Sequence, residues 1–232
     1  EPCPRASPTM ANANNPFGFM PLTSASGSTG NFEMLYRSIA YSDTTKIFRG
    51  DPVKAVTGGQ VAQWTATTDV GNLAGIFWGC HYLSTAIGTT VYSQYWPGAD
   101  VASTAQNTLY AHIIPINTGQ PAKFLVQSDA TGTAFADIGA NVDVALGTGN
   151  TTTGASGAYI VATPAATASL PFRIVELYGS ASFGAFGGGG VSGVLPGATT
   201  AGVANPYGGS YTGAYNWVIV QGNVTSTGLG LS

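Results

Sequence analysis

The chain has 232 residues, a length that suits one all-β domain with appendages, and its formal net charge is -3. Charged residues make up only 7 % of the sequence, compared with about 25 % in an average soluble domain. This composition excludes a basic nucleic-acid-binding surface and a polybasic membrane anchor, and the aromatic content of 11 % argues against a disordered chain.

The N-terminal segment, residues 1–31, is rich in Asn, Pro, Gly and Ser and carries isolated apolar side chains. Such a composition predicts an extended arm that lies on another surface. The candidate contacts with that surface are Phe17, Phe19, Met20 and Leu22. The segment lacks the charged and apolar regions of a signal peptide, so we expect no secretory route.

Residues 32–178 alternate short apolar runs with turn residues, and no stretch repeats apolar side chains at helical spacing. The pattern predicts about ten short strands and little helix, in a single β-barrel or β-sandwich domain. The expected strands cover residues 34–40, 47–48, 53–56, 61–64, 73–80, 90–95, 110–115, 123–127, 142–146, 158–162 and 172–178, with a last one at 216–221.

A Gly-rich insertion is expected at residues 179–214, followed by the final strand and a tail at 215–232. So many glycines disfavour a packed core, because each glycine loses much backbone entropy when it is ordered. Two interpretations remain open for the insertion. It is a flexible surface loop, or it becomes ordered against a neighbouring subunit through Tyr207, Tyr211 and Tyr215.

No catalytic or metal-binding motif is evident in the sequence. His81 and His112 are far apart without a ligand motif, so we interpret both as structural side chains. Asp51, Asp69 and Asp129 occur in turn contexts, where a carboxylate bonds to nearby backbone amides. We therefore expect a protein that is not an enzyme and that needs no metal or cofactor.

The chain has two cysteines, Cys3 and Cys80. Two cysteines do not make a disulfide framework, and Cys3 lies in the Pro-rich N-terminus. We favour two reduced thiols, and a bridge between them stays open.

Several segments, taken in order, resemble the capsid decoration (head cement) proteins of tailed bacteriophages. Residues 49–53 resemble their first core strand, and residues 73–79 resemble the Gly-flanked apolar strand that follows. The next similar segments are an apolar–Gln–x–Asp stretch, a loop and the last two strands, at residues 122–129, 138–156, 170–175 and 215–221.

This resemblance implies a virion structural protein that is made in the host cytoplasm, binds the outer capsid surface and clamps neighbouring capsomers. Its partner would be the major capsid protein, and three copies would form a homotrimer around a local threefold axis. In this hypothesis residues 11–31 lie on the capsid protein, for example by adding to a sheet edge, and the rest of the chain folds without them.

Two other functions remain as alternatives. In a glycan-binding β-module of a phage fibre or adhesion protein, Trp78, Trp96 or Trp217 would stack on sugar rings, although Trp78 and Trp217 also suit a core. A hydrolase would require a pocket that joins His81 or His112 to a carboxylate.

Overall fold

The computed structural model describes residues 12–22, 34–65, 72–102, 109–116, 122–166, 170–178 and 213–223. Within these residues every pairing between two numbered strands is antiparallel, three isolated bridges are parallel, and the only regular helix is the 3-10 turn η3, Phe135–Asp137. The predicted all-β class is confirmed. Its sheets are open and do not close into barrels, so of the two expected architectures the sandwich-like one holds.

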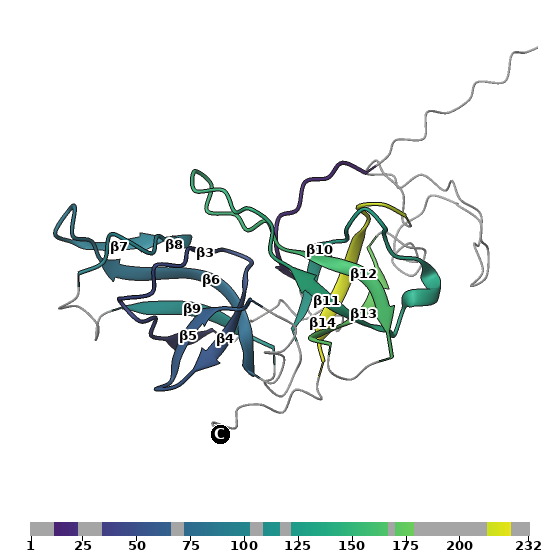
Figure 1. The fold of residues 1–232 in the computed structure, drawn as a ribbon, viewed down its shortest axis with the longest axis horizontal. Coiled ribbons are helices and arrows are strands. Elements are labelled where there is room, and N and C mark those ends of the chain that lie inside the picture. Colours follow the sequence, from purple (N-terminus) through teal and green to yellow (C-terminus); the bar gives the residue numbers. More distant parts are fainter. Residues whose placement is uncertain are drawn as a thin grey trace, which may run out of the picture.

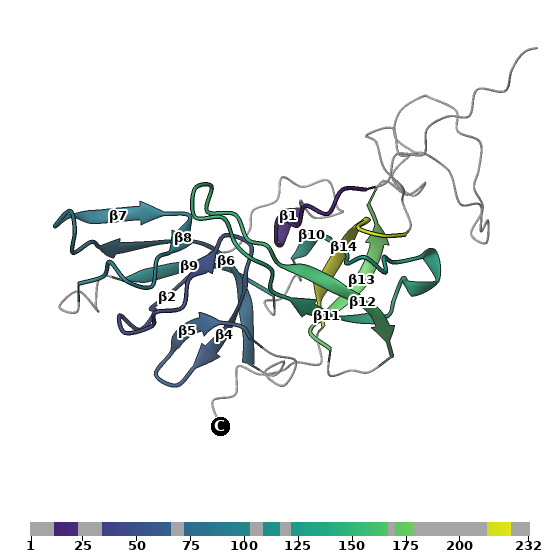
Figure 2. The ribbon, with the colours of Figure 1, turned by 45° about the horizontal axis from the view of Figure 1, so that its top comes forward.

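The first sheet contains six strands in the spatial order β1-β10-β14-β13-β11-β12 (Figure 1; β1 is labelled in Figure 2). Their bounds are Met20–Leu22 for β1, Lys123–Gln127 for β10, Trp217–Gly222 for β14, Phe172–Leu177 for β13, Asn141–Ala145 for β11 and Tyr159–Ala165 for β12. The last strand of the chain therefore lies in the middle of this sheet, between β10 and β13.

The second sheet has the order β2-β9-β6-β4-β5, and β7 pairs with the far end of β6 (Figure 2). Their bounds are Leu35–Arg37 for β2, Tyr110–Pro115 for β9, Leu73–Leu83 for β6, Pro52–Val56 for β4, Gln60–Gln63 for β5 and Thr90–Ser93 for β7. A separate two-stranded ladder joins β3 (Ile47–Phe48) to β8 (Tyr95–Trp96).

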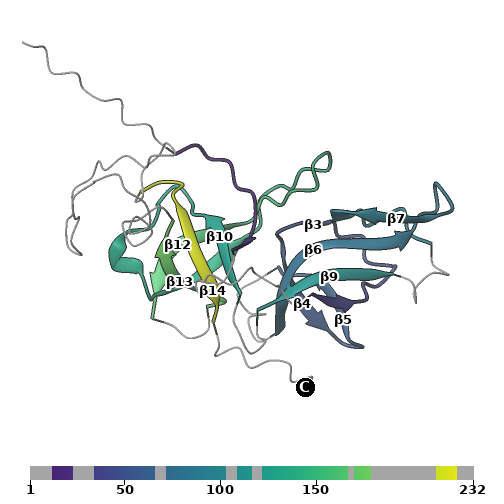
Figure 3. The same cartoon turned by 180° about the vertical axis from the view of Figure 1, so that it is seen from behind.

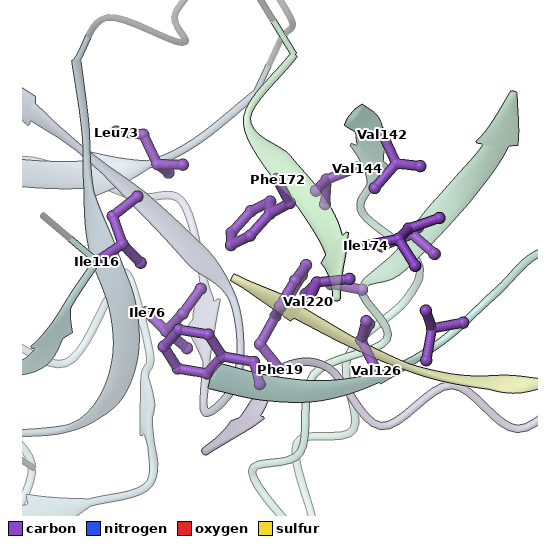
Figure 4. Close-up of a cluster of buried hydrophobic side chains, with 14 of the residues drawn as sticks. Phe19, Leu73, Ile76, Ile116, Val126, Val142, Val144, Phe172, Ile174 and Val220 are labelled. Carbon is purple, nitrogen blue, oxygen red and sulfur yellow. The ribbon is translucent and has the colours of Figure 1, made fainter. Parts of the chain in front are cut away.

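The two sheets form two lobes, which Figures 1 and 3 show side by side. One cluster of buried side chains lies between them: Phe172 and Val220 of the first sheet pack with Leu73 and Ile76 of β6 (Figure 4). A second cluster lies under the second sheet and contains Trp96. Because β6 supplies side chains to both clusters, this strand of 11 residues joins the two lobes.

The predicted strands are all found, usually within a few residues of their expected ends. The alternation in Lys123–Gln127 is also confirmed, since Phe124 and Val126 are fully buried and Leu125 is partly exposed. The expected number of about ten strands was too low, because the structure has β1–β14. The turn expected at Gly58–Gly59 is present, and both glycines adopt the positive φ that other residues rarely take.

The N-terminal arm was predicted to lie on another protein, and for residues 12–22 this is corrected. These residues lie on the chain's own first sheet, where β1 pairs with β10 in the register Met20↔Leu125 and Leu22↔Lys123. Phe19 is fully buried in the cluster between the lobes. The segment folds back because this buries the apolar ring of Phe19 and pairs the otherwise free edge of β10 with β1.

Candidate functional site

A row of aromatic and imidazole side chains crosses the outer face of the second sheet. It consists of Tyr36 on β2, Tyr110 and His112 on β9, His81 on β6 and Tyr92 on β7, and we call it the tyrosine–histidine face. The strand register brings these residues together. Residues that are paired across antiparallel strands point to the same side of a sheet.

Ring contacts run along the whole tyrosine–histidine face. The centroids of Tyr36 and His112 are 5.0 Å apart, those of His81 and Tyr110 are 5.3 Å apart, and those of His81 and Tyr92 are 5.4 Å apart. The outer rings remain open to solvent, since Tyr92 is 76 % exposed and Tyr36 is 61 % exposed. The face is therefore a preformed strip of tilted and edge-on rings, available for contact.

The local sequence explains why these rings point outward. In both β6 and β9, every second side chain near the strand end enters the buried cluster beneath the sheet: Cys80 and Tyr82 on β6, and Ala111 and Ile113 on β9. The residues between them must face the other way, because successive side chains of a strand alternate between its two sides. His81 and His112 are such intervening residues.

The two histidines contact each other at the centre of the face. His81 Nδ1 and His112 Nε2 are 3.0 Å apart, the distance of an N–H···N hydrogen bond in which one imidazole donates and the other accepts. Partial burial lowers the pKa of His112, and the nearby His81 lowers it further. His112 is consequently held neutral at physiological pH.

The structure changes the interpretation of His81 and His112. They were interpreted as structural side chains without a ligand motif, and they contact each other across two strands. The hydrolase alternative required a carboxylate beside one of them. Within the described part of the chain, the rings that contact the pair belong to tyrosines.

The four predicted contact residues of the arm differ in exposure. Phe19 is fully buried and stacks on Phe172 with 4.6 Å between ring centroids, so it is unavailable to a partner. Phe17 is partly buried and meets Trp217 edge to face, while Met20 and Leu22 are partly exposed in β1. Tyr207 and Tyr211, the contacts predicted in the insertion, lie outside the described residues.

Gln127 holds the arm in place. Its Oε1 accepts a hydrogen bond from the backbone N–H of Asn15 at 3.0 Å, and its Nε2 donates to the carbonyl of Ala13 at 2.8 Å. A further bond from Nε2 reaches the carbonyl of Tyr215. This buried amide thus joins the arm to the segment that leads into β14, and the sequence offered no signal for that role beyond the apolar–Gln–x–Asp stretch.

The turn prediction can be checked for Asp51 and Asp129, whereas Asp69 lies outside the described residues. Asp129 Oδ1 accepts hydrogen bonds from the backbone N–H groups of Thr131 and Gly132, which confirms a turn role. Asp51 accepts one from Phe48 N–H, and it is also bonded to the hydroxyl of Ser156 from the other lobe. Burial raises the pKa of Asp51. Asp51 and Ser156 are both buried, so their hydrogen bond links the two lobes away from solvent.

The exposure of the three tryptophans differs from what the glycan-binding alternative expected. Trp96 is fully buried and its Nε1 donates to the carbonyl of Asp43, so it cannot stack on a sugar. Trp217, expected in a core, is 42 % exposed. Trp78 is partly buried beneath the guanidinium of Arg49, whose Cζ lies 5.1 Å from the ring centroid.

Three other features of the described residues bear on function. No three or more His, Cys, Asp or Glu side chains gather there in a group suited to a metal ion. None of the helices in that part of the chain has the length and apolar character to cross a membrane. Cys80 is a buried free thiol, and Cys3 lies outside the described segments.

Comparison with known proteins brings no relative to the argument. No family model matches the chain, and no significant match was found among curated proteins or solved structures.

Proposed function

We propose that this chain is a bacteriophage virion protein that decorates the outer capsid surface and stabilises the contacts between capsomers. The observation that carries the proposal is the tyrosine–histidine face, an exposed strip of rings on an open sheet. It would serve as the docking surface for the major capsid protein. The resemblance of the strand segments to decoration proteins supports the same assignment.

The chemistry of the face suits protein contact. Across the strands β2, β9, β6 and β7 it extends over three interstrand spacings, or roughly 14 Å at about 4.8 Å each. Tyrosine is enriched at the energetic centres of protein interfaces, because its ring buries a large area and its hydroxyl keeps a hydrogen bond. With charged residues at 7 % of the chain, docking would bury few ions.

A weak contact of this kind is sufficient on a capsid. A decoration protein binds the assembled shell and not its dissociated subunits, so each bound copy shifts the assembly equilibrium toward the shell. Copies that form a trimer would bind several capsomers at once, and the linked contacts would raise the overall affinity. The proposed trimer is tested by sedimentation equilibrium of the full chain, where a monomer at all concentrations would contradict it.

The docking proposal is tested with expanded shells assembled from the major capsid protein that the same genome encodes. Labelled full-length chain is mixed with these shells, and the bound fraction is measured by co-sedimentation. The double variant Tyr36→Ala/Tyr92→Ala should raise the Kd at least tenfold, which corresponds to about 1.4 kcal/mol. Thermal unfolding of the variant should match the wild type, because both rings are exposed.

The matched control is Phe135→Ala, which removes a ring that is 45 % exposed in the other lobe. It should bind shells like the wild type. Unchanged binding by the Tyr36→Ala/Tyr92→Ala variant would refute docking through this face, and absence of wild-type binding would refute the decoration function itself.

A glycan-binding module is the second candidate, favoured by one observation. Trp217 is exposed and contacts Phe17 and Tyr178 at centroid distances of 5.6 and 5.7 Å, a small aromatic platform on the first sheet. Binding to a glycan array that Trp217→Ala abolishes would establish this function. An array without any bound glycan would dismiss it.

A further inference from the structure

The contact between His81 and His112 has the geometry of a chelating pair. Both histidines lie on adjacent, central strands of the second sheet, where Gly79 pairs with His112 and His81 pairs with Tyr110. The facing atoms, His81 Nδ1 and His112 Nε2, are 3.0 Å apart. We propose that these two nitrogens bind a late first-row divalent cation, with Cu²⁺ and Ni²⁺ preferred over Zn²⁺.

The distance between the two nitrogens is close to the separation that two adjacent ligands of one metal ion require. With metal–nitrogen bonds of about 2.0–2.1 Å, a separation of 3.0 Å gives an N–metal–N angle of roughly 91–97°. Two adjacent ligands of a tetragonal ion subtend about 90°, the arrangement that Cu²⁺ and Ni²⁺ favour. A tetrahedral Zn²⁺ site needs about 109° and would force the rings apart.

The sheet supplies a rigid base for the pair, and the rings keep the freedom to turn. Strand pairing holds both backbones on two sides. β6 pairs with β9 and β7, and β9 pairs with β6 and β2. The His χ2 torsion has a broad energy profile, so each ring can swing its lone pair from its neighbour toward a shared ion. Both side chains are partly exposed, which leaves an approach from solvent.

The protonation state favours metal binding. A metal ligand must be a neutral imidazole, and the hydrogen bond between the two rings already requires one unprotonated nitrogen as its acceptor. In the metal-free pair one hydrogen lies between the two nitrogens. On metal binding this hydrogen moves to the outer nitrogen of the same ring, Nε2 of His81 or Nδ1 of His112, so no net proton is released.

The remaining coordination positions belong to water in the isolated chain, since no third His, Cys, Asp or Glu joins the group within the described residues. Two imidazoles bind copper more weakly than a three- or four-ligand site does. The metal site lies on the same tyrosine–histidine face as the proposed docking surface, but it does not require the decoration function and would exist on a chain that never meets a capsid.

The experiment titrates full-length protein with CuCl₂, NiCl₂ and ZnCl₂ in a non-chelating buffer, using isothermal calorimetry. The variants are His81→Gln and His112→Gln, which keep a polar side chain, and Tyr110→Phe is the matched control on the same face. Each glutamine variant should weaken Cu²⁺ binding at least tenfold, while the control keeps the wild-type affinity. The double glutamine variant measures binding elsewhere, for example at Cys3.

Electron paramagnetic resonance of the Cu²⁺ complex adds a structural readout. The wild type should show hyperfine coupling to two imidazole nitrogens, and each single variant should show coupling to one. A second measurement avoids variants altogether: the chain has only 2 histidines, so ¹⁵N-histidine NMR follows both rings, and both should respond to Ni²⁺ together.

Three results would overturn the proposal. The first is a Cu²⁺ affinity of both glutamine variants that equals that of the wild type. The second is an electron paramagnetic resonance spectrum of the wild type that shows coupling to only one imidazole. The third is Zn²⁺ binding tighter than Cu²⁺ or Ni²⁺, which would contradict the preference of the pair for a tetragonal ion.

Discussion

Replacing Phe19 with alanine tests whether the N-terminal segment belongs to the core. The ring is fully buried between the lobes, stacked on Phe172 at 4.6 Å and edge-on to Phe124 at 6.2 Å. Truncating a buried phenylalanine to alanine costs about 3–5 kcal/mol, through lost transfer energy and the cavity that remains. A folded domain has only about 5–15 kcal/mol in total, so the loss should be large.

The assay is equilibrium unfolding in urea, followed by tryptophan fluorescence, with Trp64 as a reporter in the same cluster. We expect a lower midpoint with an unchanged slope, and a melting temperature lower by roughly 6–20 °C. Phe17→Ala is the matched control, because that ring is only partly buried. It should cost about 1 kcal/mol or less.

A Phe19→Ala variant within about 1 kcal/mol of the wild type, at an unchanged slope, would refute the reasoning. It would show that residues 12–22 lie loosely on the sheet, as expected of an arm that is free to bind another protein. A large loss also predicts that a chain lacking residues 11–31 will be unstable. Deletion of this segment is therefore a poor test of capsid binding.

Three further predictions concern buried groups. Burial raises the folded-state pKa of Asp51 above its unfolded value. The free energy of unfolding of the wild type should therefore fall relative to that of Asp51→Asn as the pH rises from about 3 to 7. Parallel curves of unfolding free energy against pH for the two proteins would contradict this. The amide that this substitution introduces can accept from Phe48 N–H and donate to Ser156. Burial also raises the pKa of Cys80 to about 12, so at about pH 8 a thiol reagent should label Cys80 only after unfolding, and rapid native labelling of both cysteines would count against it. Gly132→Ala should destabilise by about 1–3 kcal/mol in thermal unfolding, because φ is +71° and a Cβ would collide with the carbonyl of Gly213; a neutral effect would disprove that contact.

The local sequence determined the elements and their faces. Alternation in Lys123–Gln127 identified Phe124 and Val126 as core side chains, and paired glycines located the turn before β5. Such features are readable because the side-chain direction in a strand depends on the residue's own position and its neighbours. The same rule places His81 and His112 on outward faces once their strands are recognised.

The tertiary structure decided which strands lie next to each other, and with that the candidate site. β6 pairs with β9 although β7 and β8 lie between them in the chain, and β10 pairs with β14, which is far along the chain. These pairings are set by the packing of whole sheets, which no local pattern contains. Only they bring two distant histidines within 3.0 Å, bury Phe19 and Trp96, and leave Trp217 exposed.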